Sequence, residues 1–423
     1  MNFESLGLNA ALCEAATQAG YTQPTPIQSE AISHVLQGVD LLAQAQTGSG
    51  KTLAYVLPLL QRLAATAASR DDAPKKRITR VLVLVPTREL ATQVSDVWRN
   101  LARPLTQSIK VGTVFGGVSI NPQMMSLRSG AEVVVATPGR LLDLVDHNAL
   151  HLGQVQHLVL DEADRLLDLG FADELQRVLA LLPSQRQNLL LSATFAPEVQ
   201  SLAEALLHQP ARITIAHTEA HAPDIAQRAI AVDDKKRTPL LRHLIKQHSW
   251  TRVLVFVATR YACEHVANKL YQAGVFASAL HGEMSQGARQ EVLAEFKEER
   301  WEVLVTTDLA SRGIDIANLP VVVNYDLPRS ATDYTHRIGR TGRAGASGVA
   351  VSFVTASSLA HWQLIQKRER IQLPIEHLDG FEPTDAPVPV PVLTDGNGGI
   401  KGKRPSKKDK LRAAAKQVES SSD

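Results

Sequence analysis

Short apolar runs alternate along this chain with longer segments of helical character. Met284, Ala288, Val292 and Phe296 recur at helical spacing and predict an amphipathic helix over residues 283–298. Buried strands separated by helices are typical of parallel sheets with helices on both faces, so the pattern predicts an α/β protein. The candidate strands are residues 41–43, 81–85, 133–136, 158–160 and 189–191, and then 253–257, 303–306, 321–324 and 350–354.

Two interruptions divide the strands into two series. His208-Gln209-Pro210 is followed by the polar stretch 217–224, which has no apolar periodicity. We therefore expect a first domain over residues 1–216, a linker at 217–224 and a second domain over 225–373. The polar, charged segment 64–79 predicts a surface loop within the first domain.

The composition of the last fifty residues differs from the rest. Residues 383–391 are proline-rich, residues 396–399 are Gly-Asn-Gly-Gly, and residues 401–416 are rich in Lys and Arg. Such a segment cannot bury enough apolar surface to fold by itself. The sequence predicts a flexible tail over 374–423, with a nascent helix at 411–418.

The composition limits the class of protein. At 423 residues, with 44% hydrophobic and 21% charged residues, the chain predicts two or three globular domains and excludes general disorder. A formal net charge of +2 does not by itself indicate a nucleic-acid partner. Cys13 and Cys263 are far apart and predict neither a disulfide framework nor a zinc site. We see no signal peptide and no membrane span, and we expect a cytoplasmic protein.

A glycine-rich loop follows the first candidate strand. Gly48 and Gly50 allow backbone N–H groups to converge on phosphates, Lys51 can reach the β and γ oxygens, and Thr52 can hold Mg²⁺. An ordinary glycine-rich turn is the alternative, but a strand before the loop and a helix after it favour phosphate binding. The residues predicted to bind ATP here are Ala45, Gln46, Thr47, Gly48, Ser49, Gly50, Lys51 and Thr52.

A pair of carboxylates ends the strand at 158–160. Asp161 is the expected Mg²⁺ ligand, acting through a water molecule, and Glu162 the expected base or orienting group for the attacking water. Acidic residues also begin many helices, which is the alternative interpretation of Asp161-Glu162-Ala163-Asp164. Together with the loop at 45–52, the pair indicates a nucleoside triphosphatase, with Lys51, Asp161 and Glu162 as its catalytic residues.

These and further motifs resemble the DEAD-box ATP-dependent RNA helicases over residues 3 to 355. Their order and spacing carry the resemblance more than any one of them does. The further motifs are Pro24-Thr25-Pro26-Ile27-Gln28, Pro86-Thr87-Arg88-Glu89-Leu90-Ala91, Gly116-Gly117, Thr137-Pro138-Gly139-Arg140, Ser192-Ala193-Thr194, Val255-Phe256-Val257, Gln286 with Arg289, Thr307-Asp308, Arg312-Gly313-Ile314-Asp315 and 336–343 (His-Arg-Ile-Gly-Arg-Thr-Gly-Arg).

The resemblance implies two RecA-like domains that bind ATP and Mg²⁺ between them. Arg340 and Arg343 would be catalytic arginine fingers from the second domain, and Asp315 would contact the ribose. Gln28 would recognise adenine, since an amide can both donate and accept a hydrogen bond there. Phe3 would stack on the base, although simple packing of the terminus is the alternative.

The resemblance also implies a set of coupling residues and an RNA surface. Asp164, Ser192, Thr194 and His336 would link the ATP state to domain closure. Hydroxyl, amide and guanidinium groups at strand ends suit sugar-phosphate recognition, so RNA binding would be independent of sequence. The expected RNA contacts are Thr87, Arg88, Gly117, Thr137, Gly139, Arg140, Gln286, Arg289 and Thr307.

The expected function is RNA-stimulated ATP hydrolysis that drives local, non-processive unwinding of short duplexes or RNA-protein remodelling. A DNA helicase on the same plan and a non-hydrolysing RNA clamp are the competing interpretations. Residues 3–8 and the short tail most resemble the bacterial RhlE-like branch, which suggests ribosome assembly or RNA turnover, with ribosomal-precursor or RNA-decay proteins as partners. We expect a monomer. The basic tail either adds RNA affinity or is only solvated.

Overall fold

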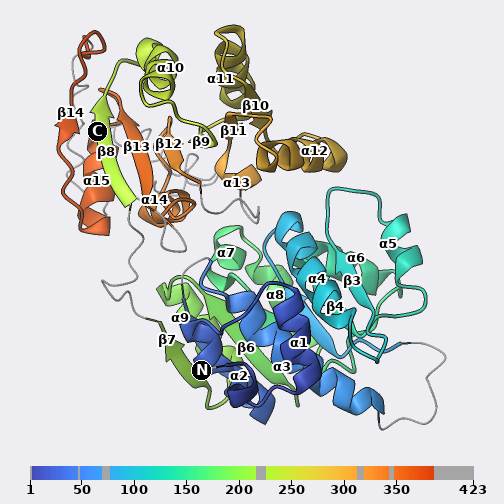
Figure 1. The fold of residues 1–423 in the computed structure, drawn as a ribbon. Coiled ribbons are helices and arrows are strands. Elements are labelled where there is room, and N and C mark those ends of the chain that lie inside the picture. The colour runs from blue at the N-terminus through green and yellow to red at the C-terminus, as the bar shows by residue number, and fades with distance from the viewer. Residues whose placement is uncertain are drawn as a thin grey trace, which may run out of the picture. The chain divides into compact units, whose positions relative to one another are not determined.

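The structure is a computed structural model that describes residues 2–45, 48–68, 77–215, 225–311, 319–342 and 347–384. It contains two seven-stranded sheets, one in each half of the chain (Figure 1). We call residues 2–215 the first domain and residues 225–384 the second domain. All strand pairs are parallel, as the alternation of strands and helices predicts.

The first domain has the strand order β3-β4-β2-β5-β6-β1-β7. Its strands are β1 Leu41–Gln44, β2 Val81–Leu84, β3 Val111–Val114, β4 Val133–Ala136, β5 His157–Leu160, β6 Gln187–Ser192 and β7 Ala211–Thr214. Its helices are η1 Glu4–Leu6, α1 Ala10–Gln18, α2 Pro26–Gln37, α3 Lys51–Ala68, α4 Arg88–Ala102, α5 Asn121–Ser126, α6 Pro138–Asp146, α7 Ala163–Asp168, α8 Ala172–Ala180 and α9 Pro197–Leu206.

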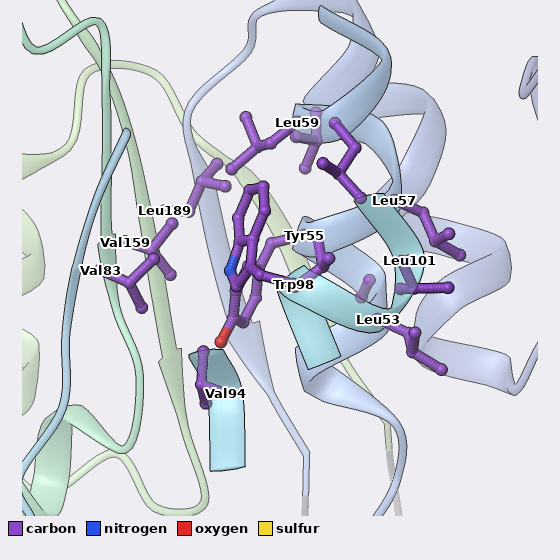
Figure 2. Close-up of a cluster of buried hydrophobic side chains, with 14 of the residues drawn as sticks. Leu53, Tyr55, Leu57, Leu59, Val83, Val94, Trp98, Leu101, Val159 and Leu189 are labelled. Atoms are coloured by element: carbon purple, nitrogen blue, oxygen red, sulfur yellow. The ribbon is translucent and has the colours of Figure 1, made fainter. Parts of the chain in front are cut away.

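The sheet of the first domain separates two hydrophobic clusters. Because successive strand residues point to opposite faces, Val81 and Val83 belong to one cluster while Leu82 and Leu84 belong to the other. The first cluster is built around Trp98 of α4, which is fully buried among apolar side chains from the sheet and from α3 (Figure 2). Burial of both faces explains why these strands are continuous Val and Leu runs.

The second domain has the strand order β10-β11-β9-β12-β13-β8-β14. Its strands are β8 Ile225–Ala231, β9 Val253–Phe256, β10 Ala277–Leu280, β11 Val303–Thr306, β12 Val321–Asn324, β13 Gly348–Val354 and β14 Ile375–Glu376. Its helices are η3 Asp234–Lys236, α10 Arg237–Gln247, α11 Arg260–Gln272, α12 Gln286–Lys297, α13 Asp308–Ser311, α14 Ala331–Ile338 and α15 Leu359–Glu369.

The second domain continues past the predicted boundary at residue 373. Ile375 and Glu376 of β14 pair with β8, and Arg228 Nη2 lies 2.6 Å from Glu376 Oε2. Beyond β14, the Phe381 ring packs against His243 with 5.2 Å between centroids, and Thr384 Oγ1 donates to Asp233 Oδ2 at 2.8 Å. The prediction that the tail begins at 374 is wrong for residues 374–384. The predicted nascent helix at 411–418 and the rest of the tail lie outside the described residues.

Two other boundaries also differ from the sequence predictions. The predicted surface loop at 64–79 overlaps α3, which runs to Ala68, because residues 64–68 are mostly alanine, the residue that most favours a helix. The amphipathic helix predicted over 283–298 is α12, which begins at Gln286 after its N-cap Ser285. The predicted linker at 217–224 lies outside the described residues. Among the helices that the structure describes, none is long and apolar enough to cross a membrane.

Candidate ATP and RNA site

The predicted ATP-site residues of the first domain follow the carboxyl ends of neighbouring strands. The glycine-rich loop follows β1, the acidic pair follows β5, and Ser192 ends β6. These three strands are adjacent in the order β5-β6-β1, so their ends meet at one edge of the sheet. Ligands of open α/β sheets bind outside this edge.

The described part of the glycine-rich loop is held by its own side chains. Lys51 is 6% exposed, and its ammonium donates to the carbonyl of Ala45 at 2.6 Å. Gly50 has φ +93°, and a Cβ there would overlap Thr25 Oγ1 and Gln28 Nε2, so only glycine fits. Gln46 and Thr47, also predicted to bind ATP, lie outside the described residues.

Gln28 joins helix α2 to this loop. It is 1% exposed, its Oε1 accepts from the Thr25 amide at 3.0 Å, and its Nε2 donates to the Gly50 carbonyl at 3.0 Å. The first bond is half of a capping box that begins α2, and the second ties that helix to the phosphate loop. In the structure, Gln28 therefore positions the phosphate loop relative to α2. Adenine recognition by Gln28 stays a prediction.

Phe3 lies within the first hydrophobic cluster. Its side chain is 4% exposed and packs in the same cluster as Leu6 and Leu8. The structure therefore shows the contacts that packing of the terminus through Phe3 requires. Stacking of Phe3 on adenine stays a prediction.

The acidic pair consists of a buried Asp161 and a partly exposed Glu162, and Tyr55 of α3 organises its first member. Asp161 is 3% exposed, and its Oδ2 accepts from the Tyr55 hydroxyl at 2.8 Å. Glu162 has φ 52° and ψ 52°, a left-handed backbone that is strained in a non-glycine residue and that recurs at functional sites. Sequence reasoning missed Tyr55, although it lies four residues after Lys51 and therefore on the same face of the helix.

Burial and neighbouring charges shift the pKa of both carboxyl groups upward. Burial raises the pKa of Asp161, against the nearby Lys51, which lowers it. Burial and the adjacent Asp161 raise the pKa of Glu162, whereas Lys51 and Arg340 lower it. A carboxylate with a raised pKa is a better general base than an ordinary one, as the predicted role of Glu162 requires.

Thr52 and Asp161 fit the predicted Mg²⁺ site in their chemistry. A hydroxyl and a carboxylate oxygen are hard ligands of the kind that Mg²⁺ takes, with waters and phosphate oxygens as the rest of its shell. Both side chains interact with the hydroxyl of Tyr55, which brings them to one place. The described residues hold no cluster of three or more His, Cys, Asp or Glu side chains for a metal.

The predicted coupling residues of the first domain form one hydrogen-bonded group. Asp164 Oδ2 accepts from the Thr194 amide at 3.1 Å and from the Thr194 hydroxyl at 3.0 Å. The Ser192 hydroxyl donates to the Thr194 carbonyl at 2.7 Å. The acidic strand end and the end of β6 are therefore joined as the coupling prediction requires, while the coupling function itself stays a prediction.

His336, the fourth predicted coupling residue, is surrounded by charged groups, and its link to Asp164, Ser192 and Thr194 stays a prediction. Burial lowers the pKa of His336 well below 6.5, and Arg165 and Arg340 lower it further. The ion pair that sequence reasoning missed here joins Arg165 Nη1 to Asp333 Oδ1 at 2.7 Å. The signal available in the sequence was Arg165 immediately after the acidic tetrapeptide and Asp333 three residues before His336.

Arg337 is a further residue that sequence reasoning missed. It is 3% exposed, and its Nε and Nη2 lie 2.5 and 2.7 Å from the two oxygens of Asp308. Its Nη1 donates to the Asp326 carbonyl at 2.6 Å, and its guanidinium lies over the Phe256 ring. Arg337 thus fixes α14, which precedes Arg340. The other predicted arginine finger, Arg343, and the predicted ribose contact Asp315 lie outside the described residues.

The predicted RNA contacts of the first domain follow β2, β3 and β4. Thr87 is the N-cap of α4 and accepts from the Leu90 amide at 3.2 Å. Gly117 has φ +79°, and a Cβ there would lie 3.2 Å from Arg88 Nη1. Arg140 Nη2 donates to the Val118 carbonyl at 2.7 Å. Thr137 is the N-cap residue of α6, and around Gly139 a Cβ would meet no atom within 4 Å.

Arg289, a predicted RNA contact of the second domain, is buried and paired. Its side chain is 3% exposed, its Nη2 lies 2.7 Å from Glu89 Oε1, and the same nitrogen donates to the Ala310 carbonyl at 3.2 Å. A direct contact of Arg289 with RNA stays a prediction. Gln286 and Thr307 follow β10 and β11, and Gln286 Oε1 is buried without a hydrogen-bond partner in the described part of the chain.

Family models match both domains of the chain. The model for the DEAD/DEAH box helicase matches residues 25–202, and the helicase conserved C-terminal domain matches residues 235–345. Two solved structures are similar. Dbp5 of S. cerevisiae bound to RNA and ADP BeF3 is 31% identical with a TM-score of 0.77, covering 89% of this chain and 96% of that one. A DEAD box protein from Methanococcus jannaschii is 34% identical with a TM-score of 0.51, covering 89% and 99%.

Curated relatives agree with the family models. DEAD-box ATP-dependent RNA helicase 30 of Arabidopsis thaliana is 41% identical over 347 residues, which cover 81% of this chain and 58% of the relative. ATP-dependent rRNA helicase rrp3 of Emericella nidulans is 38% identical, covering 88% of this chain and 78% of the relative. The chain thus spans little more than half of the first relative and most of the second. It belongs to the family of DEAD-box ATP-dependent RNA helicases.

Proposed function

We propose that this protein hydrolyses ATP in response to RNA and uses the reaction to separate short RNA duplexes locally or to remodel RNA-protein complexes. The observation that carries the proposal is the Asp161-Glu162 pair, in which Asp161 is buried and both carboxylates share their electrostatic surroundings with Lys51. A fold that only needed a capped helix at this position would not require a buried aspartate followed by a strained glutamate backbone.

The residues divide the chemistry of hydrolysis between them. Lys51 and the amides of residues 48–50 bind the phosphates, and Thr52 and Asp161 would hold Mg²⁺, which neutralises phosphate charge when bound. Glu162 accepts a proton from the attacking water, or orients it, at its carboxylate. Arg340, whose charge already lowers the pKa of Glu162, supplies positive charge to the transferring phosphoryl group.

The same network supports coupling to RNA. Asp164 and Thr194 join the acidic strand end to the end of β6, so a change at the phosphates reaches the segment after β6. We infer that ATP and RNA together favour the closed arrangement of the domains. Closure would bend one strand away from the geometry of an A-form duplex, so unwinding would be local and would fail on long duplexes.

Two other functions, a DNA helicase and a non-hydrolysing RNA clamp, can be distinguished from the proposed one. A DNA helicase would use the same ATP chemistry, but the RNA helicase motifs and the RNA-bound Dbp5 structure support RNA. A non-hydrolysing clamp would keep ATP only to stay closed. The retained Glu162 and Arg340 argue against it, since a clamp needs no hydrolytic groups.

The decisive experiment is steady-state ATPase activity with no nucleic acid, with single-stranded RNA and with DNA of the same sequence. We expect strong stimulation by RNA alone, and a loss of about 10²- to 10⁴-fold in Glu162→Gln. Asp173→Asn, an exposed acid on α8, is the matched control and should retain full activity. Equal stimulation by DNA would indicate a general nucleic-acid motor, and ATP binding without hydrolysis would indicate a clamp.

The cellular setting is a further part of the proposal. Residues 3–8 support assignment to the bacterial RhlE-like branch, and the rRNA helicase among the relatives supports a role in ribosome assembly. RNA turnover is the second possibility. We further propose that the protein acts in the cytoplasm as a monomer. Co-sedimentation with ribosomal precursors or with RNA-decay proteins would separate the two roles.

A further inference from the structure

The N-terminal turn of α11 carries an exposed pair of stacked rings. Tyr261 is 73% exposed, more than any other large apolar side chain in the described part of the chain. Its ring stacks on His265, one helical turn further along, with centroids 5.7 Å apart and an interplanar angle of 14°. Since His265 supports the tyrosine ring, the pair presents a preorganised aromatic surface to solvent.

This pair lies at the edge of the sheet that carries the predicted RNA contacts of the second domain. Strands β10, β11 and β9 are adjacent and parallel, so the residues that follow them meet at one edge (Figure 1). Gln286 follows β10, Thr307 follows β11, and Thr259-Arg260-Tyr261 follow β9. Tyr261 is therefore a neighbour of the surface that the strand of RNA is expected to cross.

The first domain has an equivalent turn among its predicted RNA contacts. Thr87 caps α4 with φ −132° and ψ 155°, and Thr259 caps α11 with φ −134° and ψ 156°. Both hydroxyls accept from the amide three residues later, and both threonines precede an arginine. Because Tyr261 stands where the first domain has Glu89, an exposed ring replaces a buried carboxylate at this point of the RNA edge.

The charges beside Tyr261 are paired with one another. Arg260 forms an ion pair with Glu283, and His281 Nε2 lies 3.0 Å from Glu264 Oε1. A surface with both signs of charge next to an exposed ring is poorly suited to another phosphate. It suits the flat, uncharged face of a nucleobase, since every base offers such a face to an aromatic side chain.

We propose that Tyr261, supported by His265, is a stacking platform for one unpaired nucleobase of the bound RNA. The inference rests on the proposed function and adds to it a base contact that the sugar-phosphate contacts do not supply. The platform accepts any base, so RNA binding stays independent of sequence, but it requires a base that is not stacked in a duplex. Tyr261 is thus a determinant of preference for single-stranded RNA.

The test is an abasic scan of a single-stranded RNA of about ten nucleotides, with one base removed at a time. Affinity is measured by fluorescence anisotropy in the presence of ADP and beryllium fluoride. For the wild type, we expect that removal of one particular base weakens binding about fivefold or more. Tyr261→Ala should weaken binding of the intact RNA by the same factor and lose sensitivity to that position, whereas Tyr261→Phe should behave as the wild type.

Tyr271→Ala is the matched control. Tyr271 is 56% exposed and lies in the last turn of the same helix, roughly 15 Å from Tyr261 along the axis, so its removal should leave the scan unchanged. The platform is refuted if Tyr261→Ala gives the wild-type scan, or if Tyr261→Ala and Tyr261→Phe weaken all RNAs alike. Failure of the proposed function has a different signature, because the wild-type ATPase would then not respond to intact RNA.

Discussion

The two domains share one topology and differ in the residues that come after each strand. When the strands are numbered within each domain, both sheets have the order 3-4-2-5-6-1-7. No repeat is visible in the sequence, so the similarity is one of backbone geometry alone. The comparison teaches that the sheet is the common scaffold, and that the chemistry of each domain is set by the loops at its carboxyl edge.

Equivalent positions show the difference directly. Glu162 of the first domain corresponds to Asp326 of the second, each being the second residue after the fifth strand. Glu162 is the carboxylate proposed to act on the attacking water, whereas Asp326 lies 2.5 Å from Arg237 and accepts from the Ala258 amide at 2.7 Å. The second carboxylate therefore stabilises its own domain, a role that the first does not need under the proposed function.

The largest expected effect comes from the arginines that face these two carboxylates. Arg340→Ala should lower single-turnover ATP hydrolysis about 10³-fold or more with ATP binding retained, because the charge on the phosphoryl oxygens is no longer neutralised. Arg237 lies beside Asp326. Its replacement by alanine should lower the melting temperature but leave the rate of ATP hydrolysis per folded molecule within a few fold of the wild-type rate. A rate for Arg340→Ala close to wild type would show that the arginine is not catalytic.

The next effect contrasts a buried ion pair of the second domain with an exposed pair of the first. Arg337→Ala removes a buried guanidinium that pairs with Asp308, whose side chain is 25% exposed, and should reduce the free energy of unfolding by about 3 kcal/mol. Arg99→Ala breaks a pair with Asp96 in which both side chains are about half exposed, and it should cost about 0–1 kcal/mol. Urea unfolding of both variants measures the difference, and similar losses would contradict it.

Acid should destabilise the first domain through His157, at the start of β5. Burial lowers the pKa of His157 to about 4, and its Nδ1 lies 2.9 Å from Gln187 Oε1. Between pH 6.5 and 4 the unfolded chain binds a proton that the folded chain does not. Stability is therefore lost as the pH falls through this window, by about 2 kcal/mol at pH 5.

Urea unfolding at pH 7.5 and pH 5, compared between the wild type and His157→Gln, isolates this contribution. The variant removes the titrating group at the same position, so its stability should fall less between the two pH values. An unchanged pH dependence would show that His157 does not carry the effect.

The smallest effect tests whether the second domain needs its seventh strand. Truncation after Thr384 should leave its melting temperature unchanged. Truncation after Leu373 removes β14 and the contact of Phe381 with His243, and should cost about 1–2 kcal/mol. Equal melting temperatures for the two truncations would show that residues 374–384 do not stabilise the second domain and belong to the tail.

The sequence predicts the centre of each sheet better than its edges. Strands β2, β5, β9 and β12 are buried on both faces and appear as continuous apolar runs. The edge strands β3, β7, β10 and β14 were missed, because polar or small residues interrupt their apolar pattern. Strand β8 was also missed, since Gln227 and Arg228 interrupt its apolar pattern.

The sequence offers candidates for the site residues, but it does not reveal their partners. Motifs single out Lys51, Glu162 and Arg340 because phosphate chemistry requires those residue types in that order, and their roles stay predictions. The contacts of Tyr55 with Asp161 and of Glu89 with Arg289 join distant parts of the chain, and no local pattern specifies them. The sequence therefore predicts Arg289 as an RNA contact without revealing that its guanidinium is paired with Glu89.

The left-handed backbone of Glu162 has a consequence for how this protein can evolve. Such a conformation costs a side-chain-bearing residue about 1–2 kcal/mol, and glycine avoids that cost. Among variants at residue 162, the glycine variant should therefore give a high level of folded protein but a low rate of ATP hydrolysis. The glutamate should give the reverse. Selection for a more stable fold alone would favour glycine here, so a glutamate at residue 162 is what the proposed catalytic role predicts.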